Sequence, residues 1–274
     1  MTDKQDALLY EKDGHIVTLT MNQPELRNSM GDPAVLPLWQ QAADRINADR
    51  DVRCVILAGA GKHFSTGGNI RNMGDRAPTP DQGTRGRSPA HARARYRTGV
   101  HRIVRAVRSI ELPVIAAVQG AAVGLGCDVT CLCDMRICAD NAKFAVTFLK
   151  LGLNPGDGGA WHLQKVIGLA RASEMFYTAD PIDAQTALEW GLVSKVVPLE
   201  SLMDEARALA ERVARQPPDV LRMTKVLLRT AQTGDIETVL EMSAAMQGVA
   251  HHTEDHLEAI NAFFEKRPGN FKGQ

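Results

Sequence analysis

Short apolar runs separated by turn residues predict a series of strands in the first half of the chain. Asp13-Gly14 stands between the first two runs and is typical of a tight hairpin, so we predict that these two strands pair. The strand-like runs are residues 7–10, 16–21, 54–57, 113–118, 135–139 and 144–146. We predict that the last two runs continue the sheet formed by the earlier ones.

Apolar residues at helical spacing lie between these runs and dominate the last third of the chain. Asp32 is placed to cap a helix with Pro33 at its first position, and another helix is predicted over residues 90–109 after a loop over residues 73–88. Later helices are predicted over residues 170–178, 183–190, 199–215, 218–231, 236–251 and 254–266, with one extended run at 193–197. This order predicts an α/β core over residues 1–198 and a helical segment over residues 199–274.

Two glycine-bearing turns each follow a strand-like run, and each is predicted to open a helix. They are Ser65-Thr66-Gly67-Gly68-Asn69-Ile70 and Val123-Gly124-Leu125-Gly126-Cys127-Asp128. Such turns direct unpaired backbone N–H groups, reinforced by the helix dipole, at whatever lies in front of them. Two turns that face one another would hold an oxygen atom that carries negative charge.

The overall charge of the chain is balanced. The 274 residues include 32 basic and 32 acidic side chains, which gives no general attraction to nucleic acid or to an anionic membrane. The first residues lack the pattern of a secretory leader, and the apolar stretch 112–133 contains Pro113, several glycines and Asp128. We therefore expect a cytoplasmic protein without a membrane span.

The cysteines are expected to be buried thiols. Four of the five lie close together in apolar sequence, without paired CxxC units or nearby histidines, so we expect no metal site and no disulfide. The segment Gly59-Ala60-Gly61-Lys62 lacks the serine or threonine of a phosphate-binding loop, and Phe64 replaces the third glycine of a dinucleotide motif. Nucleoside triphosphates and NAD are thereby excluded as ligands of this loop.

Four blocks of the chain resemble the enoyl-CoA hydratase/isomerase, or crotonase, superfamily. They are KHFSTGGNI at 62–70, the stretch from PVIAAVQG to Cys127-Asp128 at 113–128, GLVSKVV at 191–197 and AFFEKR at 262–267. The resemblance covers essentially the whole chain. It implies an α/β fold in which β-β-α turns form a spiral, with a C-terminal helical extension that mediates homotrimers, often paired into hexamers.

The resemblance also implies an acyl-CoA thioester as substrate, with coenzyme A as part of the substrate and no separate cofactor. The thioester carbonyl of this superfamily lies in a hole made by two backbone N–H groups, which match Gly68 and Leu125 by motif position. Each such donor typically lowers the barrier by about 3 kcal/mol, because an enolate oxygen develops negative charge. The positions that match or adjoin coenzyme A contacts are Arg27, Gly68, Asn69, Ile70, Arg71, Phe263 and Lys266, whose alternative roles are surface charge and packing.

Asp128 and Phe148 occupy the positions of the two catalytic glutamates of the hydratases. Asp128 lies in a nearly uncharged stretch, where burial should raise its pKa towards the range used for proton transfer; its alternative role is a capping or hydrogen-bonded core carboxylate. Phe148 also stands where the monoene isomerases carry their only catalytic glutamate. Because phenylalanine cannot transfer a proton, neither the hydratase nor the isomerase mechanism carries over intact.

Asp157 is the candidate for the missing group. Its Asp-Gly-Gly sequence resembles the loop of dihydroxynaphthoyl-CoA synthases, where this aspartate lies in the active site. Dienoyl-CoA isomerases also combine an aspartate at the position of Asp128 with a loop carboxylate, although their additional glutamate is absent here. Two carboxyl groups near one acyl chain can share a proton and provide an acid and a base. The alternatives for Asp157 are an N-cap and a plain turn residue.

These residues predict an enzyme that transfers protons at the α- or γ-carbon of an acyl-CoA, with Asp128 as the main base and Asp157 as its partner. Hydration or dehydration of an enoyl-CoA is the leading hypothesis. Isomerisation of an enoyl- or dienoyl-CoA, hydrolysis, and formation or cleavage of a C–C bond remain open, since one such hole serves any thioester enolate.

Arginines concentrate between residues 85 and 108. They are interpreted either as a solvated helix face or subunit contact, or as a site for CoA phosphates or an acidic acyl group. RNA binding, which occurs in one member of the superfamily, is a rival hypothesis. The zero net charge and the three tyrosines and three tryptophans available for base stacking argue against it.

Overall fold

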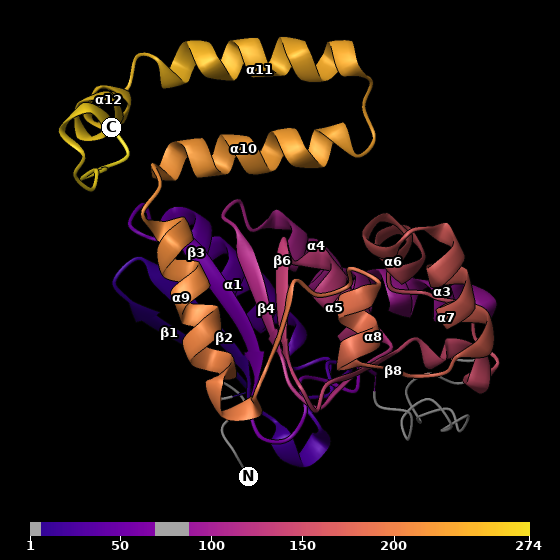
Figure 1. Cartoon of the computed structure of the whole chain (residues 1–274). Coiled ribbons are helices and arrows are strands. Elements are labelled where there is room, and N and C mark those ends of the chain that lie inside the picture. Colours follow the sequence, from indigo (N-terminus) through magenta and orange to yellow (C-terminus); the bar gives the residue numbers. More distant parts are fainter. Residues whose placement is uncertain (1–6, 69–87) are drawn as a thin grey trace.

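The computed structural model describes residues 7–68 and 88–274 and contains a six-stranded sheet with helices on both faces (Figure 1). The strand order is β1-β2-β3-β4-β6-β9; β1 is antiparallel to β2 and the other neighbours are parallel. The strands are β1 (Leu8–Asp13), β2 (Ile16–Met21), β3 (Cys54–Gly59), β4 (Val114–Val118), β6 (Met135–Ala139) and β9 (Lys195–Val197). The predicted strands and hairpin are confirmed, whereas the loop predicted over residues 73–88 lies outside the described residues except for Ser88.

The centre of the sheet is buried on both faces. Every residue of β3 and β4 is buried, as expected of parallel strands that read as continuous apolar runs. One face packs against α1 (Leu36–Ala48), α4 (Val100–Ser109) and α5 (Leu125–Leu132). The other face packs against α9 (Leu202–Ala214), which places Leu202, Ala206, Ala210 and Ala214 on the sheet at every fourth position.

A second, three-stranded sheet contains β5 (Ala121–Val123), β7 (Lys143–Ala145) and β8 (Ile182–Asp183). The prediction that residues 144–146 continue the main sheet is therefore wrong. Gly120 adopts φ +55°, which turns the chain between β4 and β5, and β5 then pairs in parallel with β7. This second sheet carries the chain into the turn before α5.

Two helix boundaries differ from the sequence-based prediction. The helix expected over residues 90–109 is divided at Gly99, whose φ of −104° and ψ of −108° are not helical. The helix expected to begin at Pro33 begins at Leu36, because the Asp32 side chain accepts a backbone N–H bond within a turn before it. The two halves of the divided helix are α3 (Pro89–Thr98) and α4.

The later helices follow the prediction to within three residues at each end. They are α7 (Leu169–Thr178), α8 (Ala184–Glu189), α9, α10 (Pro218–Ala231), α11 (Ile236–Ala250) and α12 (Glu254–Glu265). The helix α6 (Gly159–Ile167) follows the glycine loop at residues 154–158, and short 3₁₀ segments are η2 (Pro24–Leu26), η4 (Thr147–Leu151) and η5 (Leu199–Ser201).

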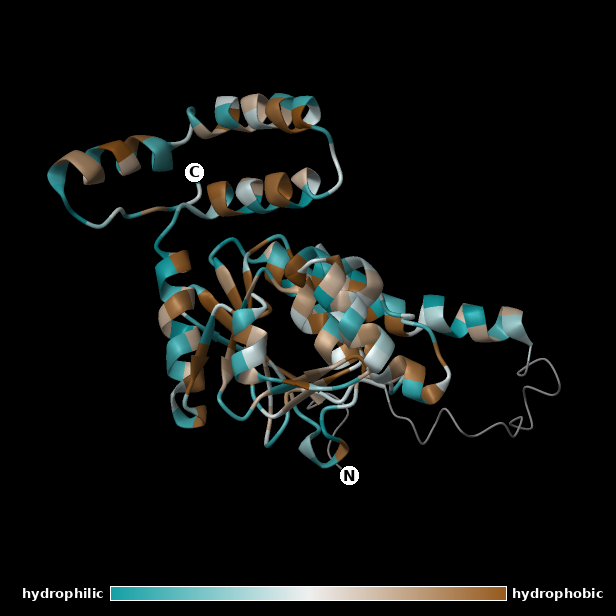
Figure 2. Ribbon diagram, turned by 45° about the vertical axis from the view of Figure 1, so that its right-hand side comes forward, coloured by the Kyte–Doolittle hydropathy of each residue, from teal (hydrophilic) through white to brown (hydrophobic). Residues whose placement is uncertain are grey.

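The C-terminal helices α10, α11 and α12 extend away from the sheet (Figure 1). α10 is anchored by Lys225, which is 4% exposed and pairs with Asp134 at 2.7 Å, and by Arg222, which pairs with Glu111 at 2.6 Å. Several apolar residues on these helices have exposed side chains, and Figure 2 colours parts of the three ribbons brown. The exposed apolar residues include Leu228, Ile236, Leu240, Val249, Leu257 and Phe263. The predicted boundary after residue 198 stays a prediction.

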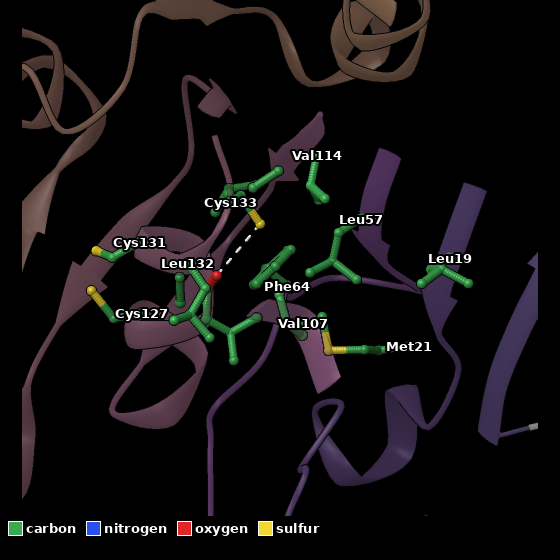
Figure 3. Packing of buried hydrophobic residues seen from close by; sticks show 14 of the residues in the cluster. Leu19, Met21, Leu57, Phe64, Val107, Val114, Cys127, Cys131, Leu132 and Cys133 are labelled. Atoms are coloured by element: carbon green, nitrogen blue, oxygen red, sulfur yellow. Dashed lines mark hydrogen bonds between the residues drawn. The ribbon is translucent and has the colours of Figure 1, made fainter. Parts of the chain in front are cut away.

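The core around Phe64 contains the crowded cysteines (Figure 3). Phe64 is completely buried, and all five cysteines are buried free thiols, which confirms that prediction. The Cys133 thiol donates to the Val129 carbonyl at 3.4 Å. Within residues 7–68 and 88–274, no helix has the length and hydropathy needed to cross a membrane.

Candidate active site

The two glycine turns lie side by side, backbone against backbone. Ser65 forms a parallel bridge with Ala122, and its carbonyl accepts the Val123 N–H at 2.9 Å. Gly67 adopts φ +74°, and a Cβ atom there would lie 2.9 Å from the Leu125 nitrogen. A side chain at this position would push the turns apart, so glycine permits their close approach.

Gly68 and Leu125 each place a backbone N–H group near this junction. α5 begins at Leu125, so the N–H of Leu125 has no acceptor within the helix. Neither N–H donates a hydrogen bond to another residue of the described chain. The adjacent Gly124 N–H, in contrast, donates to the Ala145 carbonyl at 2.9 Å. The predicted use of Gly68 and Leu125 as an oxyanion hole stays a prediction, and the turns that carry them do meet.

Asp128 lies in the first turn of α5, every residue of which is buried. It is 1% exposed, and neither carboxyl oxygen has a hydrogen-bond partner among the described residues. Burial raises the pKa of Asp128 well above its ordinary value, the neighbouring Asp157 carboxyl raises it further, and the nearby Gly159 N–H opposes the rise. The side chain therefore does not cap α5, and its polar neighbours are the Asp157 carboxyl and the Gly159 N–H.

Asp157 lies in the loop before α6 and is 4% exposed. Its Oδ1 atom has no hydrogen-bond partner in the described part of the chain. The N-cap of α6 is Gly158, and no side chain caps this helix, so the N-cap alternative for Asp157 is wrong. The structure thus brings together Asp128 and Asp157, two buried carboxyl groups that interact with one another.

Gly159 at the start of α6 holds the backbone directly against Asp128. A Cβ atom at Gly159 would lie 2.1 Å from Oδ1 and 2.2 Å from both Cγ and Oδ2 of Asp128. Only glycine therefore fits at this position without displacing the carboxyl group. The sequence analysis did not identify this contact; its only signal was the glycine pair that follows Asp157.

Phe148 lies beside the second glycine turn. It belongs to η4, is half-buried, and places its ring 3.7 Å from where a Cβ atom on Gly124 would stand. Because Gly124 immediately precedes Leu125, this ring borders the site while offering no proton. The sequence-based placement of Phe148 at the site is consistent with this contact.

α3 and α4 hold the loop that carries Asp157. The His101 Nε2 atom is 2.7 Å from the Gly156 carbonyl oxygen, so this nitrogen donates the hydrogen bond. A Cβ atom on Gly156 would lie 2.6 Å from the Tyr96 ring, and one on Gly158 would lie 3.7 Å from Val104. Sequence reasoning missed His101 and Tyr96, because nothing in the chain indicates a contact across 55 residues.

The predicted coenzyme A residues are distributed over the molecule. Arg27 is exposed beside the first glycine turn, where its carbonyl accepts the Thr66 N–H at 3.0 Å. Phe263 is 79% exposed on α12, which lies far from α5 in Figure 1, and Lys266 ends that helix. A single chain therefore does not bring these two residues to the glycine turns. Asn69, Ile70 and Arg71 lie outside the described residues.

The part of the chain that the structure describes contains no group of three or more His, Cys, Asp or Glu side chains arranged to hold a metal ion.

Comparisons with known proteins match nearly the whole chain. A family model described as enoyl-CoA hydratase/isomerase matches residues 11–274. The chain is 34% identical over 261 residues to the 1,2-epoxyphenylacetyl-CoA isomerase of Escherichia coli (strain K12), covering 94% of this chain and 95% of that protein. It is 33% identical over 267 residues to the crotonyl-CoA hydratase of Syntrophomonas wolfei, covering 97% of this chain and 98% of that protein.

The crystal structure of an enoyl-CoA hydratase from Bacillus anthracis has the same fold. Its TM-score is 0.88 at 32% sequence identity, and the match covers 98% of this chain and 100% of that one. This similarity confirms the expected α/β architecture over both the sheet and the C-terminal helices.

Proposed function

Because the chain belongs to the enoyl-CoA hydratase/isomerase family, we propose that it polarises the carbonyl of an acyl-CoA thioester and moves protons on the acyl side. The proposed donors to the carbonyl are the N–H groups of Gly68 and Leu125. The proposed acid and base are Asp128 and Asp157, and the proposed reaction is the hydration of an enoyl-CoA and its reverse. Coenzyme A enters as part of the substrate.

The observation that carries this proposal is the unpaired, buried carboxyl group of Asp128. Burying a carboxyl group costs free energy, so the position of Asp128 next to a second buried carboxyl group, that of Asp157, needs a reason other than stability. Its raised pKa lets it hold a proton to higher pH than an exposed aspartate does. Proton transfer to or from a substrate is such a reason.

The chemistry requires one of the two carboxyl groups to be protonated and the other ionised. Water attacks the β-carbon while the ionised carboxylate takes a proton from this water molecule. The π electrons of the double bond then move onto the thioester oxygen, which the two N–H groups hold. The protonated carboxyl then delivers its proton to the α-carbon, which restores the thioester carbonyl. Two close carboxyl groups favour this singly protonated state, because joint ionisation places like charges side by side.

Phe148 supports isomerisation as a second candidate reaction. Its ring borders the second turn in place of a carboxyl group, which leaves fewer groups to orient a water molecule. An enzyme that moves a double bond needs only to take a proton from one carbon and return it to another. The same pair of aspartates serves that reaction, and the mass of the product distinguishes it from hydration.

The remaining residues fit a substrate that is shared between subunits. Arg27 lies by the first turn, and Arg71 follows Gly68 by three positions in the sequence, so we propose that both meet the phosphates of coenzyme A. Phe263 and Lys266 reach a coenzyme A molecule only from another subunit. The exposed apolar residues of α10, α11 and α12 supply a surface for the proposed homotrimer or hexamer.

The test is turnover of a trans-2-enoyl-CoA followed by mass spectrometry of the acyl product. Addition of one water indicates hydration, an unchanged mass with a shifted double bond indicates isomerisation, and free coenzyme A indicates hydrolysis. The variant Asp128→Asn should lose the activity while retaining the far-UV circular dichroism of the parent. Full activity in that variant would refute the proposed role of Asp128.

A further inference from the structure

Six exposed arginines lie on α3 and α4; Arg108 contacts the His162 side chain at 3.0 Å, and the other five are referred to together as the arginine surface. This arginine surface consists of Arg93, Arg95, Arg97, Arg102 and Arg105. Residues 89–109 contain no aspartate or glutamate. In Figure 2 the helix that follows the grey trace is coloured largely hydrophilic and projects from the body of the molecule.

None of these five guanidinium groups is paired with a carboxylate within the described residues. Elsewhere in that part of the chain Arg50, Arg207, Arg222 and Arg267 each form an ion pair. By sequence, residues 69–87 add four arginines and two aspartates, so pairing with both of those aspartates would still leave a positive excess. The arginine surface is thus a source of uncompensated positive potential.

The stability of the fold does not account for this surface. α3 buries none of its residues, so the hydrophobic core does not dictate its composition. Arg93 and Arg97 are four residues apart on one helix face, where like charges weaken a helix. A helix that accepts this repulsion without contributing to the core is consistent with a binding role.

The position of α3 and α4 indicates which part of the substrate they meet. Tyr96 and His101 contact Gly156, the residue before Asp157, so the helices that carry the arginines border the acid–base loop. Arg93 and Arg97 both project on the same side of Tyr96, because the residues three positions before and one position after a given residue lie close together around a helix. Arg27, the proposed contact of coenzyme A, lies instead beside the first glycine turn.

We propose that the arginine surface binds a carboxylate at the far end of the acyl group, so that the preferred substrate is an ω-carboxyacyl-CoA. This inference rests on the proposed function, since it places the acyl chain next to Asp157. The thioester end meets the glycine turns, the reacting carbons meet the carboxyl pair, and the terminal carboxylate meets Arg97 and Arg93. Arginine suits this role because its planar group binds a carboxylate through two parallel hydrogen bonds.

The experiment compares trans-2-enoyl-CoA thioesters in pairs, with six, eight or ten acyl carbons. The two members of a pair have the same chain length, and one ends in a methyl group and the other in a carboxylate. We expect kcat/KM to be at least about tenfold higher for the carboxylate-ended member at the best chain length. The double variant Arg93→Gln, Arg97→Gln should remove this preference and leave kcat/KM for the methyl-ended thioester unchanged. The matched control Arg212→Gln replaces an exposed arginine on α9, across the sheet, and should preserve the preference.

Binding of the saturated, unreactive thioesters separates this inference from the proposed reaction. Calorimetry should show tighter binding of adipoyl-CoA than of hexanoyl-CoA, and the double variant should abolish the difference, even where no hydration occurs. Equal affinity and equal kcat/KM for the two members of every pair would overturn the inference and leave the proposed function standing. An equal loss of kcat/KM for both members of each pair in the double variant would also overturn the inference, because that result would assign these arginines to the phosphates of coenzyme A.

Discussion

Replacing Gly159 with alanine is expected to remove most of the activity while the fold persists. A Cβ atom at this position would lie 2.1 Å from Oδ1 and 2.2 Å from Cγ and Oδ2 of Asp128. Ordinary van der Waals contact with a Cβ atom begins at 3.4 Å, so the carboxyl group or the start of α6 must move by about 1.3 Å. Misplacement of a catalytic group by about 1 Å costs on the order of 100-fold, and we expect kcat to fall by that factor.

The stability of Gly159→Ala should change much less than its activity. Crowding in a packed interior costs about 1–3 kcal/mol, whereas alanine in place of glycine within a helix returns roughly 0.5–1 kcal/mol. We therefore expect the free energy of unfolding to fall by about 0–2.5 kcal/mol, measured by urea denaturation, with unchanged far-UV circular dichroism.

Gly248→Ala is the matched control for Gly159→Ala. Gly248 lies within α11, and a Cβ atom there would meet no atom within 4 Å. This variant should keep the parent kcat and gain up to about 1 kcal/mol of stability. The reasoning is refuted by a Gly159→Ala protein that folds and retains kcat within twofold of the parent, because the position of the Asp128 carboxyl would then not limit the reaction.

Three further predictions follow from charged groups. Asp157→Asn should shift the titration of Asp128 to lower pH, because the Asp157 carboxyl raises that pKa; NMR of carboxyl-labelled aspartate in the parent and in the variant reports the shift. Burial and nearby cationic side chains lower the pKa of His162 to about 4, so the protein should lose stability as pH falls from 6.5 to 4. Urea denaturation should show a smaller loss in His162→Gln than in the parent. Lys225→Met should lower the free energy of unfolding by about 2 kcal/mol, because it leaves Asp134 without its ion pair. An unchanged midpoint of urea denaturation would contradict this prediction.

The parts of the fold that depend on local chemistry were predictable from the sequence. Asp13-Gly14 sets a hairpin by its own backbone preference, and Pro218 starts α10 at the residue predicted. The divided helix at Gly99 was not predicted, because a single glycine is compatible with a continuous helix and only tertiary packing decides its conformation. The second sheet was missed for a related reason, since strand pairing is decided by contacts distant in the sequence.

The residues of the candidate site were predictable only where a motif of the resembled family matched an individual position of this sequence. Asp128 and Asp157 were named from the motifs, and the structure brings them together as neighbouring buried carboxyl groups. The contact of Gly159 with Asp128 and the bond from His101 to the Gly156 carbonyl are distant in sequence and leave no periodic signal. Such contacts follow from how α6 and α4 pack, which composition and spacing do not specify.

Incorporation of solvent deuterium at the α-carbon of an acyl-CoA tests the central claim most directly. The parent enzyme, incubated with a trans-2-enoyl-CoA in deuterated water, should place deuterium at that carbon at the rate of turnover, as detected by NMR of the product. Asp128→Asn should still bind the thioester and show no incorporation above the uncatalysed rate. Incorporation by Asp128→Asn at the rate of the parent enzyme would contradict the claim that this buried carboxyl group moves the proton.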